Sequence, residues 1–233
     1  MKARLLAVTA IPAVAALLSV ATGCNQLPGA SRVETVERPD SITNFHTLYS
    51  QNCAGCHGTE GQSGAALNLA NPIYQAWVDD ATLRKIITNG EPGTQMPAFG
   101  QSAGGLLTDA QIDAIVKGMR TTWPANGALN GPNPPAYAAT EQGDATRGQA
   151  VYQTACVRCH SEQNQKVTDP TYLALVNDQT LRTIIVAGRT DLGHPDWRGD
   201  IPGRPLTGGE VSDIVAYLNS LRSQTPGQPY SHP

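Results

Sequence analysis

Two segments of the chain, residues 80–90 and 178–188, show the same helical pattern of apolar positions. Apolar side chains recur at i, i+3 and i+4 in both segments, which places them on one face of a helix. Each segment begins at a residue pair that can cap a helix, and each ends at a glycine, where a left-handed residue commonly closes a helix. The caps are Asp79-Asp80 and Asn177-Asp178, and the glycines are Gly90 and Gly188.

Two more helices are predicted from capping-box patterns. These patterns begin at Thr108, with Gln111 three residues later, and at Thr207, with Glu210 three residues later. No segment shows a convincing strand-like alternation of apolar and polar residues. We therefore predict an all-α fold.

The helical segments belong to an internal repeat. The run Asn71-Pro72-Ile73-Tyr74 aligns with Asp169-Pro170-Thr171-Tyr172, and Thr82-Leu83-Arg84 aligns at the same offset with Thr180-Leu181-Arg182. The repeat predicts two duplicated domains at residues 43–122 and 144–222. Residues 123–143, rich in proline and glycine, form the predicted linker, and residues 223–233 a flexible tail.

The first 23 residues have the composition of a secretory signal peptide. Lys2 and Arg4 precede an apolar stretch that is short for a membrane span, and small residues follow it. The run from Val20 to Cys24 resembles the lipobox of bacterial lipoproteins, which implies that Cys24 is lipidated and that residues 24–42 form a tether. The alternatives are an uncleaved single-span anchor and an ordinary secreted protein with a stray cysteine. The interpretation favoured is a lipid-anchored protein on the periplasmic side of the cytoplasmic membrane.

Composition narrows the possible functions. The formal net charge is −3, charged residues make up 15% of the chain, and no basic run follows residue 4, so nucleic-acid binding is not expected. Aromatic residues supply only 5% of the sequence, which leaves two small domains with meagre side-chain cores. Small domains of this kind usually need additional stabilisation from a covalent crosslink, a metal or a cofactor.

Two copies of the pattern C-x-x-C-H indicate where a cofactor could provide that stabilisation. They are Cys53-Ala54-Gly55-Cys56-His57 and Cys156-Val157-Arg158-Cys159-His160. The pattern is the attachment signature of c-type haem, in which two thiols bond the haem and the adjacent histidine binds the iron. A zinc site and a redox-active dithiol are the competing interpretations. The expected cofactors are two covalently bound haem c groups.

The order of these features resembles two tandem class I cytochrome c domains. In that family the first and last helices cross where a glycine meets an aromatic residue. The second domain fits this rule, with Gly148 in its first helix and Tyr217 in its last. In the first domain the aromatic residue, Phe45, lies in the first helix and the glycine, Gly118, lies in the last. We therefore predict that Phe45 packs on Gly118 and that Tyr217 packs on Gly148.

The resemblance also implies a distal iron ligand in each domain. Met96 lies in a loop that looks like the distal-methionine loop of the family, and at an offset of 98 residues it aligns with His194. The predicted ligand pairs are therefore His57 with Met96 and His160 with His194. The alternatives are that Met96 only packs in the core, and that His194 lies near an iron that is open or water-bound. Met119 is expected in the core, and His46 and His232 in solvent.

Four further residues are weaker candidates by the same resemblance. Pro72 and Pro170 would offer backbone carbonyls to the proximal imidazoles, and Arg84 and Arg182 would face haem propionates. Alternatively, the prolines only start turns and the arginines are solvated helix residues.

The resemblance implies a dihaem electron carrier for exported redox proteins or for a membrane electron-transport complex. Methionine ligation raises a haem potential relative to a second imidazole, so electrons are expected to run from the second haem to the first. The alternatives are a peroxidase-like or thiosulfate-oxidising dihaem enzyme, and a haem-based gas sensor. Each of these alternatives requires an open or labile iron position.

Overall fold

The computed structural model describes residues 37–161 and 167–223. The contacts between Cα atoms divide the chain into Met1–Arg38 and one compact unit that begins at Pro39. Within the described ranges the secondary structure is helical, and β-pairing is limited to isolated bridges, which confirms the all-α prediction. The predicted signal peptide, Cys24, His232 and most of the predicted tail lie outside the described residues.

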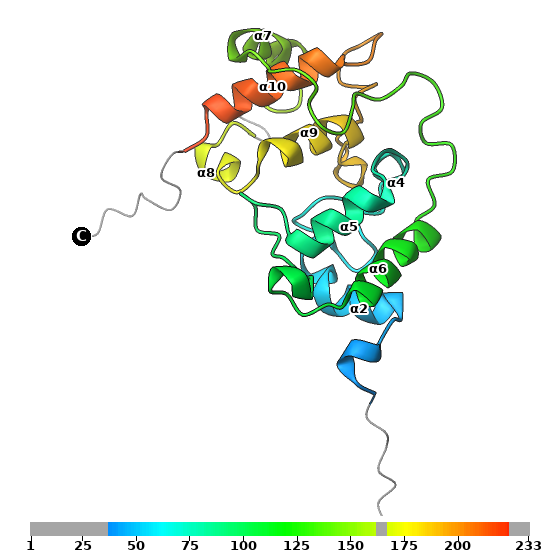
Figure 1. The fold of residues 1–233 in the computed structure, drawn as a ribbon. Helices are drawn as coiled ribbons and strands as arrows, with labels where there is room; N and C mark the ends of the chain where they lie inside the picture. Colours follow the sequence, from blue (N-terminus) through cyan, green and yellow to red (C-terminus); the bar gives the residue numbers. More distant parts are fainter. Residues whose placement is uncertain (1–36, 162–166, 224–233) are drawn as a thin grey trace, which may run out of the picture. The chain divides into compact units, whose positions relative to one another are not determined.

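The first half of the compact unit contains five α-helices and two short 3₁₀ turns (Figure 1). The turns are η2 (Pro39–Ser41) and η3 (Gln101–Ala103), and the helices are α2 (Phe45–Asn52), α3 (Ala54–His57), α4 (Pro72–Trp77), α5 (Asp80–Asn89) and α6 (Asp109–Thr122).

The second half repeats this order, with the haem motif after its first helix but no named helix over the motif itself. Its elements are α7 (Ala145–Ala155), α8 (Pro170–Leu173), α9 (Asp178–Ala187), η4 (Thr190–Leu192) and α10 (Gly208–Ser220). In each half the first helix packs on the last, α2 on α6 and α7 on α10.

The predicted N-terminal caps are confirmed. The side chains of Asp79 and Asn177 accept hydrogen bonds from the backbone N–H groups three residues later, and complete capping boxes open α6 and α10.

The C-terminal glycines differ from the prediction. Gly90 and Gly188 have φ values of +70° and +75°, but their ψ values of −172° and 169° lie outside the left-handed helical region. The chain therefore leaves each helix in an extended direction, into the loop that carries the predicted distal ligand.

Both predicted helix crossings are confirmed. A Cβ atom built on Gly118 would lie 2.2 Å from Cγ of Phe45, so the Phe45 ring occupies the space that a side chain at 118 would fill. A Cβ atom on Gly148 would lie 1.9 Å from the backbone oxygen of Asp213 and 2.9 Å from Cβ of Tyr217. The glycine lies on the last helix in the first half and on the first helix in the second half. In both arrangements the two helices contact each other closely.

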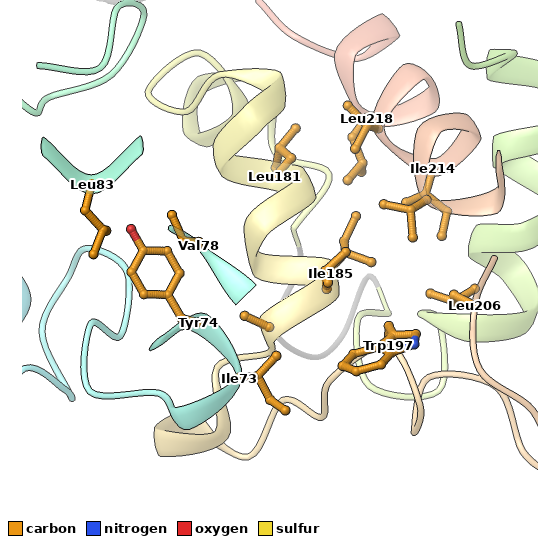
Figure 2. Packing of buried hydrophobic residues seen from close by; sticks show 14 of the residues in the cluster. Ile73, Tyr74, Val78, Leu83, Leu181, Ile185, Trp197, Leu206, Ile214 and Leu218 are labelled. Atoms are coloured by element: carbon orange, nitrogen blue, oxygen red, sulfur yellow. The ribbon is translucent and has the colours of Figure 1, made fainter. Parts of the chain in front are cut away.

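One cluster of buried apolar residues runs through both halves (Figure 2). Ile73 and Tyr74 of α4 belong to this cluster together with Ile185 of α9, and α4 packs on α9. Met119 on α6 is 2% exposed, which confirms its place in the core. His46 is exposed, also as predicted.

Residues 123–143 lie against both halves. The Trp123 ring packs edge-on against Tyr49, with ring centroids 5.2 Å apart. The backbone oxygen of Pro135 accepts a hydrogen bond from Nε1 of Trp77, and that of Tyr137 accepts one from Nε of Arg182. Side-chain contacts therefore hold the predicted linker to α4 in the first half and to α9 in the second.

The last residues of the predicted tether contact α6. Nε2 of Gln111, in the first turn of α6, donates hydrogen bonds to the backbone oxygens of Pro39 and Ile42. Residues 39–42 therefore belong to the folded unit.

Candidate haem-binding sites

Both C-x-x-C-H motifs begin where the preceding helix ends. Cys53 is the C-terminal cap of α2, and Cys156 is the C-terminal cap of α7. The second thiol follows within one turn and is exposed in both copies, whereas the first is partly buried. Burial raises the pKa of the Cys53 thiol to about 11 and that of Cys156 to about 12. All four thiols are free of disulfide bonds, so each is available for a thioether bond.

The first proximal imidazole is fixed by a backbone carbonyl. His57 is buried, and its Nδ1 lies 2.8 Å from the oxygen of Leu67, which accepts the Nδ1 proton. Nε2 is therefore the nitrogen left to bind a metal. Burial also lowers the pKa of His57, which favours the neutral form that ligates iron.

The hydrogen bond of His57 does not go to the predicted proline, and the prediction for Pro170 stays a prediction. The oxygen of Leu67, not that of Pro72, accepts the hydrogen bond from His57. Pro72 and Pro170 instead occupy the first turns of α4 and α8, where their fixed φ angles suit a helix start. The oxygen of Pro170 accepts hydrogen bonds from the backbone N–H groups of Ala174 and Ser223.

Met96 lies in a loop packed against the glycine that ends α5. A Cβ atom on Gly90 would lie 2.7 Å from the backbone oxygen of Met96, so a side chain at position 90 would collide with the loop. The backbone N–H of Glu91 donates to that same oxygen, and the N–H of Phe99 donates to the oxygen of Ile87. Met96 itself is partly buried against the apolar cluster.

The corresponding loop of the second half also packs against a glycine. A Cβ atom on Gly188 would lie 2.5 Å from the backbone oxygen of Pro195. The backbone N–H of His194 donates to the oxygen of Arg189, and the N–H of Trp197 donates to the oxygen of Val186. The two loops therefore share the close approach to a glycine, but their backbone hydrogen bonds join different positions.

The second half brings its two predicted axial ligands together. The rings of His160 and His194 have centroids 5.6 Å apart and planes inclined at 35°. They line one pocket with Cys156, Cys159 and Asp200. Nδ1 of His194 donates to the oxygen of Pro195 at 2.7 Å, which leaves its Nε2 for a metal, and burial lowers the pKa of this imidazole.

The side chains that line this pocket are those that a covalently attached haem requires, namely two thiols and two imidazoles. Imidazole nitrogens lie about 2 Å from a bound metal ion, so two imidazoles that held one metal between them would have ring centres about 6 Å apart. The observed 5.6 Å between His160 and His194 is slightly shorter than this separation. Within the described ranges, no group of three or more His, Cys, Asp or Glu side chains is arranged to hold a metal ion.

Sequence reasoning missed Asp200, which lines the same pocket. The residue is 6% exposed, and its Oδ2 is buried without a hydrogen-bond partner in the part of the chain that the structure describes. Burial raises the pKa of this carboxyl group to about 7, against the opposing effect of the nearby Arg158 guanidinium. Asp200 has no acidic counterpart in the first half, where Gln101 and Ser102 align with it, so the repeat gave no signal for it.

The two arginines contact other parts of the protein. Arg84 forms salt bridges with Asp109 and Asp113, at the start of α6. Arg182 is 3% exposed, and its guanidinium donates to the oxygens of Ala136 and Tyr137. Both guanidinium groups therefore join helices to neighbouring segments, and their contact with haem propionates stays a prediction.

Comparison with known proteins agrees with the two-domain division. Residues 40–117 match the family model described as cytochrome c oxidase, cbb3-type, subunit III, and residues 145–222 match the model described as cytochrome c.

Three curated relatives are named as cbb3-type cytochrome c oxidase subunits. CcoP of Azospirillum sp. (strain B510) is 28% identical over 152 residues, which cover 58% of this chain and 46% of that protein. FixP of Bradyrhizobium sp. (strain ORS 278) is 29% identical, with coverages of 75% and 59%. CcoP of Rhodobacter capsulatus is 26% identical, with coverages of 87% and 68%. The chain thus spans about half of the length of the first two relatives.

A solved chain from the Kuenenia stuttgartiensis reducing HAO-like protein complex is 16% identical and superposes with a TM-score of 0.45, covering 81% of this chain and 100% of that chain. In the described segments, no helix is both long enough and apolar enough to cross a membrane.

The repeated attachment motifs, the facing imidazoles and the two family matches lead to one conclusion. The chain is a dihaem c-type cytochrome, built from two tandem cytochrome c domains that each bind one haem c covalently.

Proposed function

We propose that this protein carries single electrons between exported redox partners at a membrane and does not transform a substrate. The observation that carries this proposal is the pairing of His160 with His194 in one pocket. An iron held between two imidazoles has no position left for a substrate. Met96 aligns with His194 at an offset of 98 residues, so each domain has its own candidate for a second ligand.

The protein side chains give the two sites different redox properties. Haem supplies a one-electron iron couple when it is bound. Met96 favours the reduced iron relative to a second imidazole, so the first site takes the higher potential. His194 gives the second site the lower potential. Electrons then pass downhill from the site at His160 to the site at His57, and onward to an acceptor.

The relatives support a role beside a membrane complex. They are named as subunits of cbb3-type cytochrome c oxidases. We infer that this chain likewise serves a membrane electron-transport complex and that it is attached to the membrane through lipidated Cys24.

Mass spectrometry of the membrane-extracted protein tests the attachment. A diacylglycerol mass on Cys24, lost together with membrane retention in Cys24→Ser, supports the lipid anchor. Membrane retention of the Cys24→Ser variant with an intact N-terminal segment would instead show a single-span anchor.

The test of the carrier function is the Soret spectrum of the fully reduced, haem-loaded protein before and after addition of carbon monoxide. An unchanged spectrum means that both irons keep two protein ligands. A shift in about half of the haem would refute the carrier proposal and favour a catalytic or gas-sensing second site.

Ligand variants test the assignment of the two sites. His194→Met is expected to raise the lower midpoint potential, and Met96→His to lower the higher one, each without affecting the other site strongly. Met119→Leu is the matched control, because Met119 is buried in the core and its counterpart in the second domain is Leu218. A lower potential at the Met96 site than at the His194 site in the unmodified protein would contradict the proposed direction of electron flow.

A further inference from the structure

The two domains meet through a buried ion pair. Nε and Nη2 of Arg189 each lie 3.0 Å from an oxygen of Asp191. The side chain of Arg189 is 10% exposed and that of Asp191 only 1%. Nη2 of Arg189 also donates to the oxygen of Gly64, and the backbone N–H of Ser63 donates to Oδ2 of Asp191. Both partners therefore reach from the second domain into the first.

The contacted loop packs directly on the first haem motif. A Cβ atom on Gly64 would lie 2.3 Å from the oxygen of Cys56 and 2.6 Å from the backbone carbon of His57, so the backbone at position 64 touches the motif. A displacement of Gly64 would therefore be transmitted to His57.

The other end of the ion pair is fixed to the second haem site. The backbone oxygen of Arg189 accepts the hydrogen bond from the N–H of His194, and these two residues form a β-bridge. The same residue thus holds the distal histidine of one site through its backbone and the loop of the other site through its side chain.

Two asparagine contacts complete the junction. Nδ2 of Asn71 donates to the oxygen of Ala187 at 2.7 Å, at the end of α9. Nδ2 of Asn177, at the start of α9, donates to Oε1 of Glu91 and to the oxygen of Pro92. The loop that leads to Met96 is therefore tied to one end of α9, while the ion pair follows the other end.

The ion pair carries no net charge, so its role at the junction is to fix geometry. The equivalent residues of the first domain at the same offset are Glu91 and Gly93, so the repeat contains this ion pair only once.

Resting on the proposed carrier function, we propose that Arg189, held by Asp191, is the positioning residue that fixes the two haem sites against each other for direct electron transfer within one chain. Electrons then pass from the second site to the first without an intermediate protein.

The experiment compares variants of the full-length, haem-loaded protein. Arg189→Gln with Asp191→Asn removes the ion pair without leaving a lone buried charge. Arg189→Lys keeps the charge and loses the bidentate geometry. The matched control is Arg198→Gln with Asp196→Asn, because this pair has the same two-residue spacing, flanks His194 on the other side and contacts the linker oxygens of Ala128 and Asn130.

Three measurements are made on each variant: the thermal unfolding profile, the two midpoint potentials and the rate of electron exchange between the haems. Loss of the charged hydrogen bonds should weaken domain docking by about tenfold or more. The double variant is expected to unfold in two separate transitions and to exchange electrons more slowly, while both midpoint potentials stay nearly unchanged because the pair carries no net charge. Arg189→Lys should show the weakened docking and the slower exchange as well. The control pair should change neither docking nor exchange.

The proposal is overturned if the Arg189 variants keep both axial ligand sets, as judged by their absorption spectra, and still match the unmodified protein in docking and exchange rate. It is equally overturned if the control pair has the same effect. Carbon monoxide binding by the unmodified protein would refute the carrier function, whereas the unfolding profiles would still report on the junction.

Discussion

The reversed helix crossing in the first domain predicts that the two glycines respond differently to substitution by alanine. At Gly118 the added Cβ would meet Phe45, at 2.2 Å from Cγ, 2.3 Å from Cδ2 and 2.5 Å from Cβ. At Gly148 it would meet the backbone oxygen of Asp213 at 1.9 Å. A carbon atom normally approaches a carbonyl oxygen to no less than about 3.3 Å, so α7 and α10 must separate by about 1 Å or more.

The expected costs follow from this difference. Overpacking typically costs about 1–3 kcal/mol, and alanine regains about 1 kcal/mol over glycine in a helix interior. Gly118→Ala should therefore lose about 1–2 kcal/mol, since the two closest atoms belong to the Phe45 ring, which can rotate away, and only the 2.5 Å approach to Cβ of Phe45 requires the helices to shift. Gly148→Ala should lose about 3 kcal/mol or more, since backbone must move.

Urea unfolding of the haem-loaded protein, followed by far-ultraviolet circular dichroism, measures these costs as shifts in midpoint at constant slope. A double-mutant comparison tests the cause. Phe45→Ala should recover about 1 kcal/mol in the Gly118→Ala background because it removes the two closest atoms. Tyr217→Ala should recover little in the Gly148→Ala background, because the oxygen of Asp213 remains. Equal costs, or equal rescue by the two ring deletions, would refute the reasoning.

Three further predictions concern pH and the distal loop. Burial raises the pKa of Asp200 to about 7, so ionisation of this carboxyl group destabilises the folded protein increasingly as the pH rises from about 4 to 7. Asp200→Asn should therefore raise the free energy of unfolding by up to about 4 kcal/mol at pH 8 and hardly at pH 4. Urea unfolding midpoints at the two pH values measure this difference. The hydrogen bonds from Arg189, with smaller contributions from Ser63 and Asn68, hold the pKa of Asp191 at about 2, below its usual value. The pair should therefore add about 2 kcal/mol to the free energy of unfolding above pH 4, and this contribution should be lost as the pH falls towards 2. Asp191→Asn should lack this acid transition. Gly90→Ala should displace the Met96 loop and convert the first site to one that binds carbon monoxide; an unchanged Soret spectrum with carbon monoxide would contradict the close packing seen at Gly90.

Much of the fold followed from local sequence signals. Helix caps depend on neighbouring residues, so Asp79 and Asn177 were identified from the sequence alone and are confirmed. Met96 and His194 align at an offset of 98 residues, and each lies in a loop that packs against the glycine at the end of the preceding helix. A repeat compares each residue with a counterpart in the same chain, which is why these positions were readable.

The missed features depend on contacts between distant parts of the chain. The oxygen of Leu67 serves His57 through the backbone, which leaves no residue-type signal. Arg182 has a counterpart in Arg84, yet one is buried under the linker and the other pairs with acidic residues on α6. A shared residue type at a repeat position therefore did not indicate a shared role. The prolines show the same limit, since both lie in the first turn of a helix, a position that suits proline whatever else it contacts.

The glycines that end α5 and α9 have an evolutionary consequence. Gly90 and Gly188 hold the distal loops by backbone contacts alone, and these contacts do not involve the side chain at the tip. If Met96 and His194 are the sixth ligands, as proposed above, a duplicated domain can therefore exchange this ligand by changing one codon, without refolding the loop. After such a duplication, the two halves can diverge in redox potential while their scaffolds stay interchangeable, and one ancestral module suffices to generate both ends of a potential gradient.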